Sequence, residues 1–254
     1  MKFIIDTDEK TLTEQIDGHD RTLNLYSKEA FELLSKQWVK VGWNQKHIYT
    51  FTWMGRPIIQ LPEDMVRVQE LIYRLGPDVI VETGVAHGGS LVFYASLCKL
   101  MKKGRVIGID VEIRPHNRKA IEAHEMFPLI TLVEGSSIDP KIVSQVRGLI
   151  QPNESVLVLL DSNHSKQHVA DELKAYSPLV TPGSYIVSTD GIMKFLDDVP
   201  RGNPEWNWDN PDEAAADFAK EHPEFDLEPP KWQFNESNLT ENISHWPAGW
   251  LTRR

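Results

Sequence analysis

The stretch from Val79 to Ser90 carries the residues best suited to chemistry. It reads Val-Ile-Val-Glu-Thr-Gly-Val-Ala-His-Gly-Gly-Ser, an apolar run that ends at Glu82 and continues into a turn. Glycine permits tight turning and close approach of a ligand to the backbone. The turn contains Gly84, Gly88 and Gly89. The pattern predicts a buried strand, a turn and the start of a helix, which is where an α/β fold binds a nucleoside.

The acids near this turn indicate a cationic nucleoside rather than a phosphorylated one. The turn lacks the lysine of G-x-x-x-x-G-K-[ST] and departs from G-x-G-x-x-G, and NAD would need a free helix N-terminus for its pyrophosphate. A second apolar run ends at Asp110, where a ribose diol lies in a nucleoside-binding unit. We therefore expect S-adenosylmethionine, with Glu82 facing its ammonium side and Asp110 its ribose hydroxyls. A glycine turn alone is also compatible with simple packing, but the second acid favours the ligand.

Two aspartates further along the chain suggest a divalent cation. Asp161 follows the apolar run Ser155–Leu160, and Asp190 follows Ser184–Thr189. The carboxyl ends of parallel strands share one edge of a sheet, so these carboxylates would repel unless a hard cation such as Mg²⁺ binds between them. Such a cation lowers the pKa of a bound hydroxyl and orients it. Each aspartate could instead cap a turn.

His164 lies close to Asp161 in the segment Asp-Ser-Asn-His. Imidazoles exchange protons near neutral pH, so His164 could accept a proton from a substrate hydroxyl. It could equally be a third metal ligand or a turn residue without chemistry. His87 is better suited to filling space or contacting a ligand than to acting as a base. Four tryptophans lie in loop-like segments: Trp43, Trp53, Trp206 and Trp208. They could contribute to packing or form one wall of a site for a sugar ring.

Strands and helices are expected to alternate along the chain. Strand and helix patterns follow one another after Asp110, which predicts a mainly parallel α/β sheet with helices on both faces. The expected helices are 118–127, 140–150, 168–176 and 212–222, and the expected strands are 129–133, 155–160 and 184–189. We interpret residues 1–64 as a helical, aromatic N-terminal arm that packs on the sheet, with a helix from Lys28 to Lys40. Residues 65–254 form the main domain.

Composition excludes several classes of protein. The chain has 254 residues, of which 41% are hydrophobic, enough for one large α/β domain. A formal charge of −10 argues against a nucleic-acid partner, which requires clustered lysine and arginine. The single cysteine, Cys98, lies on the apolar face of the helix expected after the glycine turn, so no disulfide framework is possible. The N-terminus is too polar for a signal peptide, and no run is long enough to span a membrane, so we expect a cytoplasmic protein.

Several segments in order resemble one known family, the cephalosporin hydroxylases, also called the rhamnosyl O-methyltransferases. The likeness extends from about Tyr49 to Arg254. The stretches that carry it are Phe51–Ile59, Glu82–Ser90, Gly108–Asp110 with Arg114, His116–Arg118, Glu134–Ser137, Leu160–His164 and Pro182–Tyr185. Several such segments in order are far more specific than one glycine turn.

The resemblance implies a Rossmann-like class I methyltransferase fold that binds S-adenosylmethionine at the first two strand ends. It also implies a Mg²⁺ site near the fourth and fifth strand ends, with Asp161 and Asp190 as ligands. Ser136 and Ser137 follow the third strand, where the family's donor places its adenine, although an ordinary turn is equally consistent. The residues that we expect to bind the cofactor are Glu82, Gly84, His87, Gly88, Ser90, Asp110, Ser136, Ser137 and Asp161.

The sequence departs from related metal-dependent enzymes at two positions. Catechol O-methyltransferase-type sites place two adjacent polar ligands at the second metal position, whereas Thr189 and Gly191 flank Asp190 here. Some related sugar methyltransferases use an aspartate as base two residues after the first ligand, and that position is Asn163. An amide is a poor proton acceptor, which favours His164 as the catalytic base, acting beside Asp161.

We therefore expect a metal-assisted O-methyltransferase that acts on a small-molecule hydroxyl, with a sugar favoured by the resemblance. The alternatives are a hydroxylase or methoxylase of a β-lactam-type ring, a nucleotide-dependent sugar oxidoreductase, and a binding module without catalysis. No 2-His-1-carboxylate pattern for iron is visible, which disfavours the hydroxylase. The aromatic arm could also dock on a neighbouring copy, so a homo-oligomer is possible.

Overall fold

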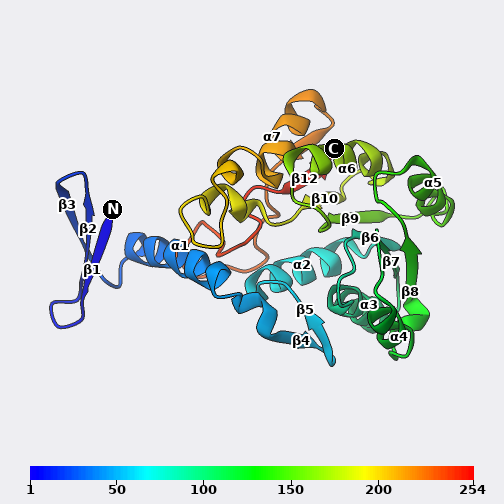
Figure 1. Cartoon of the computed structure of the whole chain (residues 1–254), viewed down its shortest axis with the longest axis horizontal. Coiled ribbons are helices and arrows are strands. Elements are labelled where there is room, and N and C mark those ends of the chain that lie inside the picture. Colours follow the sequence, from blue (N-terminus) through cyan, green and yellow to red (C-terminus); the bar gives the residue numbers. More distant parts are fainter.

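Seven strands form the central sheet of the computed structural model, which describes residues 1–254 (Figure 1). The strand order is β11-β12-β10-β9-β6-β7-β8. Only β12 runs antiparallel to its neighbours, so the expectation of a mainly parallel sheet is confirmed. The strands are β6 Val79–Thr83, β7 Arg105–Asp110, β8 Ile130–Glu134, β9 Val156–Leu160, β10 Tyr185–Ser188, β11 Phe225–Leu227 and β12 Trp250–Arg253.

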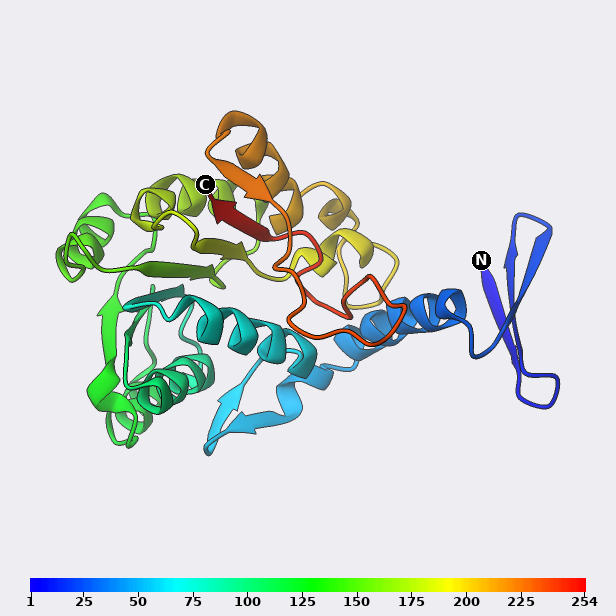
Figure 2. The same ribbon diagram turned by 180° about the vertical axis from the view of Figure 1, so that it is seen from behind.

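Helices cover both faces of this sheet (Figures 1 and 2). One face carries α2 Pro62–Leu75, α3 Gly89–Met101 and α4 Pro115–Glu122, and the other carries α5 Pro140–Gly148, α6 Lys166–Tyr176 and α7 Pro211–Glu221. Short 3-10 turns connect them: η1 His47–Thr50, η2 Phe127–Leu129, η3 Ser177–Leu179, η4 Gly191–Phe195 and η5 Pro204–Asn207. Two apolar clusters of 24 and 19 buried residues fill the two layers. Strands β6 and β9 are buried along their whole length, which is why they read as continuous apolar runs.

Most elements expected from the sequence are present within a few residues. Cys98 lies in the core on α3, and burial raises its pKa to about 11. None of the helices is both long and apolar enough to cross a bilayer. The short strands β11 and β12 were not anticipated, because three or four residues carry little periodicity.

The N-terminal region differs most from expectation. Residues 1–24 form a three-stranded antiparallel sheet that stands away from the body at the end of α1 (Figure 1), instead of packing on the central sheet. The elements are β1 Lys2–Asp6, β2 Thr11–Ile16, β3 His19–Asn24 and α1 Lys28–Asn44, followed by the hairpin β4 Phe51–Trp53 and β5 Arg56–Ile58. The dipeptide Asp17-Gly18 joins β2 to β3 with φ angles of 50° and 83°, and Asp-Gly is a typical sequence signal of a β-hairpin. The expected boundary at residue 64 falls inside α2.

The order in which strands are added to the sheet reverses at β6, and the candidate site lies at this point. The strands β7 and β8 extend to one side of β6, whereas β9 and β10 extend to the other. Thr83 and Leu160 pair at the ends of β6 and β9, so the residues that follow them, Gly84 and Asp161, lie side by side. Ligands of open α/β sheets bind in the crevice at such a switch point.

Replacing Gly84 with alanine should destabilise the fold. Gly84 has a φ of +91°, and a Cβ there would lie 1.9 Å from the Asp161 carbonyl oxygen. Gly183 is a matched control, because its φ is +80° and nothing lies within 4 Å of its Cβ position. We expect Gly84→Ala to lower the free energy of unfolding by about 1–3 kcal/mol more than Gly183→Ala, since only Gly84→Ala adds a clash to the backbone strain. Equal losses in urea unfolding would show that the contact with Asp161 is unimportant.

Candidate functional site

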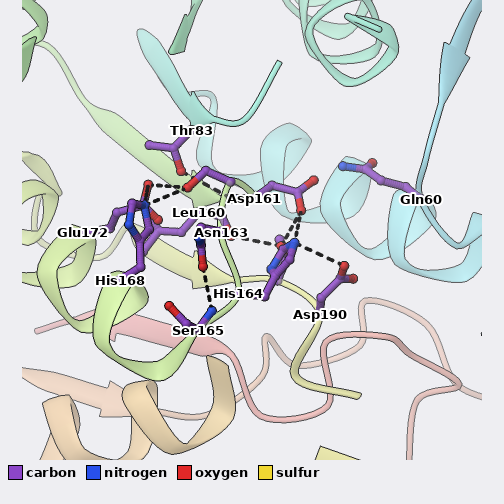
Figure 3. Close-up of polar contacts among 12 residues, drawn as sticks. Gln60, Thr83, Leu160, Asp161, Asn163, His164, Ser165, His168, Glu172 and Asp190 are labelled. Carbon is purple, nitrogen blue, oxygen red and sulfur yellow. Dashed lines mark hydrogen bonds and ion pairs between the residues drawn. The ribbon is translucent and has the colours of Figure 1, made fainter. Parts of the chain in front are cut away.

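Asp161, His164 and Asp190 converge at the carboxyl edge of the sheet (Figure 3). One potential ligand atom from each lies within 4.8 Å of the others. His164 Nε2 is 3.9 Å from Asp161 Oδ1 and 3.5 Å from Asp190 Oδ2. All three side chains are partly exposed, so a ligand can reach them.

The ends of two strands hold these side chains in place. Asp161 directly follows β9, and its N–H donates to the Thr83 carbonyl at 2.9 Å. Thr189 Oγ1 lies 2.6 Å from Asp161 Oδ1 and donates to it, which fixes the carboxylate. Asp190 adopts a left-handed conformation with φ 57°, which turns the chain sharply after β10. A Cβ at the next residue, Gly191, would lie 1.8 Å from Asp212 Oδ1, so a larger residue there would require the Asp212 side chain to move.

The site is rich in negative charge. Neither Asp161 nor Asp190 pairs with lysine or arginine, and His164 is their only ion-pair neighbour. Burial raises the pKa of Asp190 to about 6, with His164 opposing the rise and Asp161 adding to it. Burial likewise raises the pKa of Asp64 to about 7, although Asp64 accepts hydrogen bonds from Ser244 Oγ at 2.5 Å and His245 N at 2.8 Å.

This set of donors fits a divalent cation. Two carboxylates supply the oxygen ligands that Mg²⁺ prefers, and water can complete the coordination. The charge of a cation would also relieve the repulsion between Asp161 and Asp190. The structure thus brings together both expected metal ligands and the expected base.

Glu82 lies near the end of β6, two residues before Gly84 of the glycine turn. Its side chain is fully buried, and Ser90 Oγ donates to its Oε2 at 2.6 Å. Burial, followed by the charge of Asp161, raises its pKa well above the usual range. Glu82 Oε1 has no hydrogen-bond partner, and neither does the buried Oε1 of nearby Gln60, whose Nε2 donates to the Tyr94 hydroxyl at 3.1 Å. Two unpartnered buried acceptors fit a cationic donor such as an ammonium group.

The glycine turn is braced from three sides. Asp110 Oδ2 accepts from the N–H groups of Val85 at 2.8 Å and Ala86 at 3.2 Å. Asp110 therefore holds the turn, and a ribose contact would come in addition to these bonds. Arg56 donates to the His87 carbonyl at 2.5 and 3.0 Å, and Asn117 Nδ2 donates to the Ala86 carbonyl at 2.9 Å.

Arg56 and Asn117 were not among the expected site residues, although both lie in the segments that carry the resemblance. The His87 side chain is half-buried, and its carbonyl is the atom that Arg56 binds. A Cβ at Gly88 would lie 2.4 Å from Ile121 Cδ1, so the turn also packs tightly on α4.

A second polar cluster lies on the other side of Asp161 (Figure 3). His168 Nε2 is 3.3 Å from Ser137 Oγ, 3.2 Å from Ser162 Oγ and 3.4 Å from Glu172 Oε1. The hydrogen bond with Glu172, which exceeds the effect of burial, raises the pKa of His168. Sequence reasoning missed this cluster, although His168 and Glu172 stand four apart on α6 and therefore share a face.

Ser137 is buried in this cluster, and its carbonyl accepts from the Tyr176 hydroxyl at 2.8 Å. Ser136 is half-buried, and its carbonyl accepts from the Asp139 N–H at 3.0 Å. An adenine contact by either serine stays a prediction.

A cavity of about 900 Å³ lies between α1 and the irregular segment 229–247. Its wall includes Ile192, two residues after Asp190, and Ser244, the hydrogen-bond partner of Asp64. Four aromatic side chains are among its lining residues: Phe31, Phe195, Trp232 and Trp246.

Three of the four tryptophans noted in the sequence are engaged in packing. Trp43 packs edge-to-face on Trp206 with ring centroids 6.2 Å apart. Trp53 packs on Phe93 and donates to Ser96 Oγ at 3.1 Å. Trp208 is 58% exposed. None of these four lines the cavity.

Comparison with known proteins adds independent information. The model of the family described as Rhamnosyl O-methyltransferase/CmcI matches residues 45–254. The rhamnosyl O-methyltransferase of Mycobacterium leprae is 30% identical over 178 residues, covering 68% of this chain and 72% of the relative. A structure of CmcI with Mg and SAM superposes with a TM-score of 0.52 at 18% identity, covering 81% of this chain and 77% of CmcI. An O-methyltransferase from Bacillus cereus in complex with SAH gives 0.52 at 14% identity, covering 85% and 89%. The two structures show a shared fold.

Cation affinity should depend on the ionisation of Asp190. Because its pKa is raised to about 6, Asp190 is protonated below that pH, and a cation must displace the proton. We expect Mn²⁺ affinity, measured by calorimetry, to fall as the pH drops through about 6. Asp190→Asn should weaken binding by roughly tenfold to hundredfold and flatten this pH dependence. The exposed Asp197, changed to asparagine, serves as the control and should behave like the wild type.

Proposed function

Because the chain belongs to the Rhamnosyl O-methyltransferase/CmcI family, we propose that it transfers a methyl group from S-adenosylmethionine to a hydroxyl of a small, sugar-like acceptor, assisted by a divalent cation. The observation that carries this proposal is the convergence of Asp161, His164 and Asp190 beside the glycine turn. The acids of that turn suit the positive charges of the methyl donor.

In the proposed donor site, acidic side chains complement the positive charges of S-adenosylmethionine. Glu82 and Gln60 each present an unpartnered buried oxygen suited to the ammonium group. Asp110 lies at the end of the neighbouring strand, where a ribose is bound in related folds. Ser136 and Ser137, after β8, are the proposed adenine contacts. Gly84, Gly88, His87 and Ser90 shape the turn between these contacts.

Asp161 and Asp190 are the proposed ligands of the cation. When bound, the cation would supply charge that lowers the pKa of an acceptor hydroxyl and orients it. Thr189 keeps Asp161 aimed into the site through its hydrogen bond. The Asp190 side chain is only 18% exposed, which limits the water that competes for its carboxylate.

His164 is the proposed base. Mg²⁺ prefers oxygen ligands, which leaves the imidazole to take the hydroxyl proton. In the step, the acceptor oxygen forms its bond to the methyl carbon while the carbon–sulfur bond breaks, and the proton passes to His164. The sulfonium thereby becomes a neutral thioether. Holding donor and acceptor in one crevice can contribute roughly 7–11 kcal/mol to the acceleration.

The acceptor is proposed to enter from the cavity between α1 and segment 229–247. Its volume of about 900 Å³ suits a small molecule, and its aromatic surface suits the apolar faces of sugar rings. The Mycobacterium leprae relative is a rhamnosyl O-methyltransferase by name, which supports a saccharide hydroxyl as the acceptor. Neither a hydroxylase nor a sugar oxidoreductase finds comparable support.

Methyl transfer should depend more on Asp161 than on His164. His164→Ala is expected to lower kcat by about 10²–10⁴-fold, the usual contribution of a positioned base, and to leave Mn²⁺ affinity within a few-fold. Asp161→Ala is expected to lower kcat further and to weaken Mn²⁺ binding as well. Product formation is followed by mass spectrometry with a panel of glycosides, and His19→Ala, on the distant N-terminal sheet, is the control. Full turnover of Asp161→Ala in the presence of a chelator would exclude the metal-assisted mechanism.

Binding of the donor can be tested without any acceptor. Calorimetry should detect affinity for S-adenosylmethionine and for its demethylated product. Glu82→Gln should weaken both by roughly tenfold to hundredfold, because a charge-assisted hydrogen bond to the ammonium is lost. The exposed Glu125, changed to glutamine, is the control. A wild-type protein that binds neither compound would overturn the proposed function.

A further inference from the structure

The N-terminal sheet is a separate structural feature of this chain. Strands β1, β2 and β3 form their own sheet, which reaches the body only through α1 (Figures 1 and 2). The family match begins at residue 45, so the sheet lies outside it. The proposed methyl-transfer chemistry uses none of its residues.

This sheet leaves large apolar side chains in solvent. Ile4 is 40% exposed, Ile5 is 51% exposed and Ile16 is 42% exposed. Ile5 and Ile16 lie on the same face as Leu12, which is fully buried, whereas Ile4 lies on the opposite face. Three strands of five or six residues cover Leu12 but leave Ile4, Ile5 and Ile16 in solvent. Exposed apolar groups concentrated on one small sheet indicate a surface that another molecule covers.

The outer edge of β1 is the most specific part of this surface. β1 is an end strand, so one row of its backbone N–H and C=O groups is unpaired. Its sequence is Lys-Phe-Ile-Ile-Asp, with opposite charges at its two ends. In an antiparallel pairing of this strand with itself, centred on Ile4, Lys2 faces Asp6 and Phe3 faces Ile5. Both ion pairs then form at once, and every central pair is apolar.

We propose that β1 pairs antiparallel with β1 of a second copy of this chain, making a six-stranded sheet across a two-fold axis. The two-fold symmetry follows because each copy supplies the same edge. Lys2 and Asp6 of each copy contact Asp6 and Lys2 of the other. The pairing also joins the two apolar faces into one surface, with the Phe3 and Ile5 side chains of both copies side by side.

The opposite edge of the sheet fits a second copy less well. Antiparallel self-pairing of β3, His19–Asn24, would place Asp20 against Leu23 and Arg21 against Thr22. No ion pair forms in this full-length register, and charged groups meet uncharged ones. A shifted register that places Asp20 against Arg21 leaves Leu23 and Asn24 without partners inside the strand. Only β1 combines ion pairs with a full-length pairing.

A charge exchange tests the proposal on the full-length protein by sedimentation velocity. Lys2→Glu places only acids at the ends of β1, and Asp6→Lys places only bases there. Each variant alone should therefore weaken dimerisation by roughly tenfold or more, because two attractive pairs become repulsive. Mixing the two variants should restore a dimer, since every end pair is attractive again in the mixed species.

Matched controls separate pairing from general effects of charge and folding. Lys10→Glu in the first turn and Asp20→Lys on β3 make the same charge changes away from the β1 edge, and should leave the dimer intact. Asp6 Oδ1 also accepts from the N–H groups of Asp8 and Glu9 in the turn. Asp6→Asn keeps an acceptor there and should weaken the dimer less than Asp6→Lys.

Three results would overturn the proposal. They are a monomeric wild type, a dimer that neither Lys2→Glu nor Asp6→Lys weakens, and a mixture of the two variants that stays monomeric. Circular dichroism of each variant shows whether the chain remains folded. Methyl-donor binding by the monomeric variants should match the wild type, so failure of the pairing and failure of the proposed function give different results.

Discussion

Three acidic side chains meet at the carboxyl edge of the sheet without a lysine or arginine partner, and the arrangement of the crevice follows from them. Glu82, Asp161 and Asp190 occupy the ends of three neighbouring strands, β6, β9 and β10. Burial raises the pKa of Glu82 and Asp190, so keeping these acids there costs stability in the absence of positive charge. The register of the sheet nevertheless holds them together. A fold that maintains such an arrangement is pre-organised for cationic ligands.

The sequence was sufficient for the central sheet because burial leaves a strong pattern. Val79–Thr83 and Val156–Leu160 are apolar at nearly every position, as strands covered on both faces must be. An acid that ends such a run stands at the carboxyl edge, which is why Asp161 and Asp190 were expected to meet. The N-terminal strands are half polar and have no large core to face, so their alternation is weak. The Asp17-Gly18 turn is the only clear sequence signal of these strands.

Contacts between distant segments could not be predicted from one sequence. Asp64 on α2 is tied to Ser244, 180 positions away, in a loop that has no periodic pattern. His168 and Glu172 lie on a helix predicted correctly, yet their link to Ser137 depends on how α6 packs against the loop after β8. Asp110 was expected to bind a ribose, and its hold on the turn amides became visible only in three dimensions. Such roles depend on tertiary packing, which periodicity does not encode.

The closeness of Glu82 to Asp161 has a thermodynamic consequence. The charge of Asp161 is one reason why the pKa of Glu82 is raised. Neutralising Asp161 with a metal would lower that pKa and favour the ionised form of Glu82, which is the form that holds an ammonium group most strongly. With the metal on Asp161 and the ammonium group on Glu82, as proposed, occupation of one site would favour occupation of the other. By reciprocity, each ligand would strengthen the binding of the other through this single pair of acids.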